Sequence, residues 1–171
     1  MATPISFKQI DRYLDQTFIF DTNVWLYVQS NYNDSDFGYS KVLEKLLDNN
    51  CKILLPPIVG TEFVNRYCRQ AFEVFKDAYP NKKNYKYDFR PSPAYAIAFN
   101  YISGIIQEDI LPFVEYVPIE NSDFELSLTS SKLKDLNDDI IMNVTLRTKS
   151  ILVTHDRDYI SAPSSLKLLQ L

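Results

Sequence analysis

The sequence predicts an α/β protein in which helices cover both faces of a central parallel sheet, a three-layer α/β/α arrangement. Short apolar runs alternate along the chain with longer segments whose apolar residues recur at helical spacing. The length of 171 residues suits one domain with a sizeable core. A content of 46% hydrophobic and 23% charged residues is that of an ordinary soluble globular protein. We therefore expect a single domain over residues 1–171.

Four apolar runs are predicted to be strands. They are TFIFD at residues 17–21, CKILLPP at 51–57, FVEYVPI at 113–119 and SILVTHD at 150–156. The run LKLLQL at 166–171 is expected to add a last strand at an edge of the sheet.

Helices are predicted between these strands. Residues 38–49 place apolar side chains at helical spacing behind Ser40, a plausible N-cap. A long helix fits 58–79, and a second fits 92–110 after a basic and aromatic stretch. We treat the region around 80–115 as a helical insertion. A short helix is expected after Asn121-Ser122, and another, capped by Asn137, before the strand at 150–156.

Net charge and cysteine content limit which classes of partner and which cellular compartment are expected. The net charge of −4 is weak evidence against a large phosphate-binding surface, but acids that bind cations would also lower it. No apolar stretch is long enough to span a bilayer, and the polar N-terminus is no signal peptide. Cys51 and Cys68 lack a metal-ligand spacing, so we expect reduced, buried thiols and a cytoplasmic protein with no membrane contact.

Acidic residues follow the predicted strands or begin the predicted helices. Asp21 ends the first strand, Glu62 lies in the first turns of the next helix, and Asp156 ends the fourth strand. Asp138 and Asp139 open the helix before that strand. In open parallel sheets, ligands bind outside the carboxyl ends of the strands. All of these acids are expected at that end.

Carboxylates that converge there need a counter-charge, because like charges at close range raise one another's pKa values. Mg²⁺ or Mn²⁺ provides it, since hard cations prefer oxygen ligands and can activate water for phosphodiester hydrolysis. Each acid alone also has a structural explanation. Asp21 fits a helix N-cap, Glu62 and the Asp138/Asp139 pair fit the acids that helix first turns favour, and Asp156 fits turn chemistry.

Three blocks resemble the PIN-domain ribonucleases, which include the VapC toxins of toxin–antitoxin systems. They are FIFDTNVWL, LLPPIVGTEF and LNDDIIMNVTLRTKSILVTHDRDY, and residues 80–115 lie outside the resemblance. It implies a PIN-like fold and catalytic acids at Asp21, Glu62, Asp138 and Asp156. Of these, Asp21, Asp138 and Asp156 would hold Mg²⁺ or Mn²⁺. An RNA substrate, a cognate antitoxin and a possible homodimer are also implied.

Within the acidic pair, the resemblance favours Asp138. It has Ile141 three residues later and Asp156 eighteen residues later, as the family's spacing requires. Asp139 is the second choice for this metal-binding acid. Asp158 could join the site or could simply be a hydrated acid in the turn. Asn23 and Thr154 match positions where such domains place polar groups near the metal, and Asn23 is also expected to contact the substrate.

Residues 82–90 interleave cations with aromatic side chains, a combination that grips single-stranded nucleic acid. We expect Lys82, Lys83 and Lys86 to bind substrate. The alternatives are a solvated loop whose aromatics pack on the neighbouring helix, and a protein-docking surface. Arg66 lies one turn after Glu62 and could meet a phosphate or pair with an acid. His155 is expected to turn outward and is not assigned as a general base.

The function predicted is a metal-dependent endoribonuclease, the toxin of a toxin–antitoxin pair. A PIN-like module that binds RNA or protein without cleaving, and a DNA nuclease related to flap endonucleases, remain alternatives. FDTNV also resembles the first motif of haloacid-dehalogenase phosphatases. That family needs an acid where this chain has Asn23, which argues against it.

Overall fold

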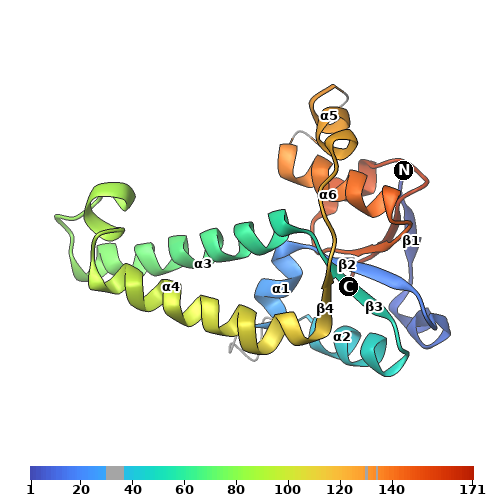
Figure 1. Cartoon of the computed structure of the whole chain (residues 1–171), viewed down its shortest axis with the longest axis horizontal. Helices are drawn as coiled ribbons and strands as arrows, with labels where there is room; N and C mark the ends of the chain where they lie inside the picture. The colour runs from blue at the N-terminus through green and yellow to red at the C-terminus, as the bar shows by residue number, and fades with distance from the viewer. Residues whose placement is uncertain (30–36, 130, 134) are drawn as a thin grey trace. The chain divides into compact units, whose positions relative to one another are not determined.

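The computed structural model describes residues 1–29, 37–129, 131–133 and 135–171. Six parallel strands form one sheet in the order β1-β6-β5-β2-β3-β4 (Figure 1). The strands are β1 (Thr3–Ile5), β2 (Thr17–Phe20), β3 (Lys52–Leu55), β4 (Val114–Tyr116), β5 (Ile151–Val153) and β6 (Lys167–Leu169). The predicted α/β class with a central parallel sheet is confirmed.

The two central strands, β2 and β5, consist almost entirely of buried residues. Strands buried on both faces read as continuous apolar runs, which is why the sequence located them. The prediction for 166–171 was wrong in one respect. β6 lies between β5 and β1 rather than at an edge, because the unpredicted strand β1 pairs with its outer side.

Helices α1 (Thr22–Val28), α2 (Tyr39–Asp48), α5 (Asn121–Thr129) and α6 (Leu136–Arg147) accompany this sheet, with α1 and α2 on one side and α5 and α6 on the other (Figure 1). Two predicted caps were wrong. Gly38, with φ of 86°, precedes α2 in place of Ser40. Asp135 caps α6 in place of Asn137, because its carboxylate accepts the N–H groups of Asn137 and Asp138.

Short helical turns complete the chain: η1 (Phe7–Arg12), η2 (Tyr85–Phe89), η3 (Ile106–Ile110), η4 (Leu111–Phe113) and η5 (Arg157–Ser161). The contacts divide the chain into two compact units, residues 1–59 with 113–171, and residues 60–112. The second unit contains most of α3 (Pro57–Ala78) and all of α4 (Pro93–Ile105). It includes most of the insertion predicted around 80–115.

The second unit has a small aromatic core of its own. Phe72 and Phe75 of α3 pack on Phe89, whose side chain is fully buried, with ring centroids 5.4 and 5.2 Å away. Tyr85 meets Phe72 edge-on at 5.3 Å. Packing on the neighbouring helix therefore accounts for Tyr85 and Phe89, whereas Tyr87 is 71% exposed.

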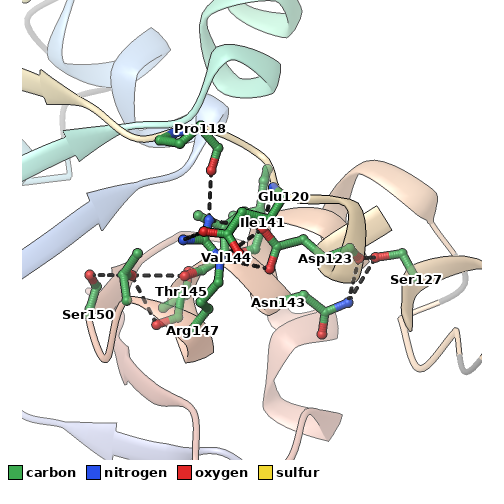
Figure 2. A network of polar contacts seen from close by, with 11 residues as sticks. Pro118, Glu120, Asp123, Ser127, Ile141, Asn143, Val144, Thr145, Arg147 and Ser150 are labelled. Atoms are coloured by element: carbon green, nitrogen blue, oxygen red, sulfur yellow. Dashed lines mark hydrogen bonds and ion pairs between the residues drawn. The ribbon is translucent and has the colours of Figure 1, made fainter. Parts of the chain in front are cut away.

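A buried ion pair fixes α5 and the segment before it to α6 (Figure 2). The Arg147 guanidinium donates from Nε to both oxygens of Asp123, at 3.1 and 3.0 Å. It also donates to the Pro118 carbonyl at 2.6 Å and to the Glu120 carboxylate at 3.1 Å. Only 3% of the Asp123 side chain is exposed, so this carboxylate depends on Arg147 for its charge balance.

Two further observations concern the helices and the cysteines of the chain. No helix in the described ranges is long and apolar enough to cross a membrane. Cys51 and Cys68 are both buried free thiols, as predicted, and burial raises the pKa of each.

Candidate acidic active site

Asp21 stands directly after β2, where it caps α1. Its Oδ1 accepts the Thr22 N–H at 2.7 Å. Its Oδ2 accepts the Thr154 hydroxyl at 2.7 Å and the Asn23 amide at 2.9 Å. The residue is only 4% exposed, and these donors offset the cost of burying its charge. Asp21 is thus a helix cap, and it also lies at the sheet edge where ligands bind.

Register brings the other strand-end residues to Asp21. Phe20 of β2 is opposite Val153 of β5, so Thr154 follows at the same edge. The Thr154 hydroxyl donates to Asp21 and accepts the backbone N–H of Asp156 at 3.0 Å. One buried hydroxyl therefore connects two acids that are 135 positions apart in the sequence.

Asp138 lies in the first turn of α6, and its Oδ1 accepts the Tyr159 hydroxyl at 3.2 Å. Burial, and then the charges of Asp21, Asp135 and Asp156, together raise the pKa of Asp138 to about 7. The Tyr159 hydrogen bond opposes this rise. The electrostatic field of Asp21 and Asp156 therefore reaches Asp138, which makes these three acids one electrostatic group.

Asp139, the reserve candidate, has a different environment. It is fully buried and accepts the Ser131 hydroxyl at 2.6 Å and the backbone N–H groups of Lys132 and Leu133. Successive helical residues point about 100° apart, so Asp139 faces the loop before α6 while Asp138 faces Tyr159. This geometry favours Asp138 as the acid of the site and Asp139 as the anchor of the loop.

Asp139→Ala should lower the free energy of unfolding by about 1–3 kcal/mol, because the Ser131 hydroxyl and the backbone N–H groups of Lys132 and Leu133 lose their buried acceptor. Urea denaturation measures this loss. Asp139→Asn is the matched control, since it keeps one acceptor oxygen and should cost less. A variant of unchanged stability would show that Asp139 does not anchor the loop.

Tyr159 was missed as a site residue. It is buried in η5, and its pKa is raised well above the ordinary value by burial and by Asp21 and Asp138. A single tyrosine in a short turn is more often a packing residue than a site residue, so composition gives no reason to single it out. Its position three residues after Asp156 was the available signal, because that spacing returns the ring to the strand end.

The donor set fits a hard divalent cation. In the part of the chain that the structure describes, Asp138 and Asp156 each use one carboxylate oxygen in a hydrogen bond and leave the other open. No three His, Cys, Asp or Glu side chains among the described residues form a group that could hold a metal ion directly. Mg²⁺ commonly binds through one or two carboxylates and keeps several waters, so the two observations are compatible. Asp21, Asp138 and Asp156 would hold such an ion directly or through water.

Two other predicted site residues belong to the second unit. Glu62 lies in the first turns of α3, and its Oε1 accepts Nε of Arg66 at 2.8 Å and pairs with Nη2 at 2.7 Å. Arg66 thus pairs with an acid, the commoner of its two expected roles. The Glu62 side chain is 17% exposed. Roles for Glu62 in catalysis and Arg66 in substrate binding remain predictions.

The predicted lysines lie on the exposed surface of the second unit. The Lys82 ammonium is 5.3 Å from the Tyr79 ring centroid, and the Lys86 ammonium is 5.5 Å from that of Tyr87. Lys83 is also exposed. Cations over exposed rings suit contacts to phosphate and base together.

Asn23 and His155 are part of the scaffold around Asp21. The Asn23 amide donates to Asp21, and its carbonyl oxygen accepts the His155 N–H at 3.2 Å. Contrary to expectation, His155 does not turn outward. Its ring packs among Tyr27, Phe37 and Tyr39, and its Nδ1 lies 3.1 Å from the Tyr39 hydroxyl. Asp158 is exposed and contributes its N–H to Asp156.

Comparison with known proteins supports the fold. No protein-family model matches the chain, and no curated protein matches it in sequence. A solved structure that resembles it is the VapBC2 complex from Rickettsia felis bound to a DNA fragment from their promoter. The TM-score is 0.55 at 16% identity, over 90% of this chain and 97% of that chain. The chain has a PIN-like fold.

Proposed function

We propose that this protein is a Mg²⁺- or Mn²⁺-dependent endoribonuclease and the toxin of a toxin–antitoxin pair. The observation that carries the proposal is the placement of Asp21, Asp138 and Asp156 at one edge of a parallel sheet, with the pKa of Asp138 raised to about 7 by burial and by the other acids. An acid cluster that raises its own pKa values is stabilised by a cation.

The residues of the chain have distinct roles in this proposal. Thr154 and Asn23 orient Asp21, and Tyr159 orients Asp138. Asp156 is fixed through its backbone by Thr154. A bound divalent ion would activate water and stabilise charge on the phosphodiester. Glu62 would help to orient the water for in-line attack, and Lys82, Lys83 and Lys86 would bind the RNA backbone.

The partner proposed is an antitoxin protein. It is supported by the solved structure with the same fold, which is a VapBC2 complex. A cytoplasmic location and a homodimer belong to the same proposal.

The decisive experiment is cleavage of labelled RNA and of a DNA strand of matched sequence, with Mg²⁺, with Mn²⁺ and with chelator. Wild-type protein should cut RNA only with metal, and Asp21→Asn should lose activity severely. The proposal fails if the Asp21→Asn variant cuts nearly as well as wild type. Preferential cutting of DNA would favour the flap-endonuclease alternative.

A second candidate function is a module that binds RNA or protein without cleaving it. It is favoured by the finding that no three potential ligands form a direct metal-binding group within the described residues. Calorimetric titration of Mn²⁺ separates the two candidates. The nuclease should bind Mn²⁺, and Asp21→Asn should weaken that binding, whereas an inert module should give no heat.

Replacing Lys82, Lys83 and Lys86 together by Gln should weaken RNA binding without unfolding the second unit, because all three side chains are exposed. Each lost phosphate contact on a single strand lowers the slope of log K against log salt by about 0.7, so the slope should fall by about 2. Fluorescence anisotropy at several salt concentrations measures it. Lys8, Lys41 and Lys167, changed together to Gln, form a charge-matched control for which the slope should stay constant.

A further inference from the structure

An exposed aromatic ring lies beside the acidic site and has no role in the scheme above. Phe37 is 52% exposed, and its ring centroid is 4.6 Å from that of His155, with the planes inclined at 34°. Tyr27 meets the Phe37 ring edge-on at 4.8 Å. Phe37 thus packs against two rings while about half of its surface stays exposed.

The support under Phe37 is continuous with the site. His155 stands between Thr154 and Asp156 in the chain, and its N–H is held by Asn23, which also donates to Asp21. The Tyr39 hydroxyl donates to the Thr154 carbonyl at 3.1 Å and lies 3.1 Å from the His155 ring nitrogen. The rings are therefore positioned by the same residues that position the carboxylates.

The backbone at Phe37 is unusual. Its φ is 50°, in the left-handed region that a bulky side chain rarely occupies. Such conformations cost free energy and cluster at functional sites. Here the conformation brings an apolar ring against His155 while leaving about half of its surface in water.

We infer that Phe37, backed by His155, is a stacking platform for a base of the single-stranded substrate next to the cleaved phosphodiester. This inference rests on the proposed nuclease function and adds a positioning residue to it. Aromatic side chains bind unpaired bases by stacking, and every base has a face that stacks. A platform of this kind selects single strands over duplexes, because a paired base is already stacked on its neighbours.

The test uses short single-stranded oligoribonucleotides that carry 2-aminopurine at each position in turn. Stacking quenches 2-aminopurine fluorescence, and chelator prevents metal-dependent cleavage during the measurement. Wild-type protein should quench the probe at one position. Phe37→Ala and Phe37→Leu should abolish the quenching and weaken binding about tenfold, whereas Phe37→Trp should retain both.

The control is Phe113→Ala, since Phe113 is also about half exposed, at 49%, but lies outside this cluster. It should quench and bind as wild type does. The emission of Trp25, which is 1% exposed, reports that the alanine and leucine variants are folded, and circular dichroism does so for Phe37→Trp. With Mg²⁺ present, Phe37→Ala should lower kcat/KM about tenfold and Phe37→Trp should restore it.

Each other result decides against the platform. Equal quenching by Phe37→Ala and wild type would overturn it. Metal-dependent RNA cleavage without quenching at any position would overturn the platform and leave the nuclease intact. Absence of both binding and cleavage by the wild type would overturn the platform and the proposed function together.

Discussion

Asp138→Asn should abolish RNA cleavage and, at the same time, stabilise the metal-free protein near neutral pH. Asparagine keeps an oxygen that can accept the Tyr159 hydroxyl, so the local geometry is retained. It removes a negative charge that burial, Asp21, Asp135 and Asp156 all disfavour. Loss of a residue that only hydrogen-bonds a metal ligand typically lowers activity roughly 10–100-fold, and the loss of Asp138 should lower it by more than that.

The stability gain has a defined pH dependence. The pKa of Asp138 is raised from 3.8 to about 7 in the folded protein, so the native state binds a proton that the unfolded state has released. Stability of the wild type must then fall as pH rises from about 4 to about 7, and stay level above that. Asp138→Asn lacks this decline. With allowance for solvent screening of a half-buried group, the gain at pH of about 8 is on the order of 1–2 kcal/mol.

Thermal unfolding in chelator at several pH values measures the effect, as a Tm rise of about 3–6 °C near pH 8 that vanishes near pH 4. Mg²⁺ should raise the Tm of wild type more than that of the variant. Asp158→Asn is the matched control, because Asp158 is exposed in the adjacent turn and carries the same charge. An Asp138→Asn variant that is less stable at pH 8 would contradict the electrostatic account.

The second large effect is expected at the ion pair between α5 and α6. Arg147→Met should destabilise the protein by about 3–5 kcal/mol, because it leaves the Asp123 carboxylate buried without a counter-charge. The Pro118 carbonyl and the Glu120 carboxylate also lose a donor. The midpoint of urea denaturation measures the change.

Two further variants make this result specific. Adding Asp123→Asn to Arg147→Met should recover part of the loss, because it removes the unpaired buried charge. Lys45→Met is the matched control. Its pair with Asp11 has side chains 43% and 70% exposed, and such surface pairs contribute about 0–1 kcal/mol. A loss of less than 1 kcal/mol for Arg147→Met would show that the buried Asp123 carboxylate does not depend on Arg147 as its counter-charge.

The central strands and helices could be predicted because the residues that determine them are neighbours in the sequence. β2 and β5 are runs of mostly apolar residues. The apolar residues of α3 recur at helical spacing over many turns, and Ser92 caps the start of α4. β1 was missed because a strand of three residues with only one buried carries little pattern. The position of β6 depends on β1, so it could not be predicted without it.

The same contrast holds for the site. Placement of Asp21 and Asp156 follows from strand ends, which the sequence marks. The different environments of Asp138 and Asp139 depend on Tyr159 and on residues 131–133, which are tertiary contacts. The packing of His155 among rings from two distant helical segments is likewise absent from any local pattern.

The order of the strands also governs how the protein is made. β2 pairs with β5, and β1 pairs with β6, so the sheet joins segments that lie far apart in the sequence. On the ribosome, Asp21 is synthesised more than a hundred residues before Thr154 and Asp156. Pairing between such distant segments slows folding. A nascent chain therefore carries Asp21 in an unassembled site until β5 and the residues after it have been synthesised and released.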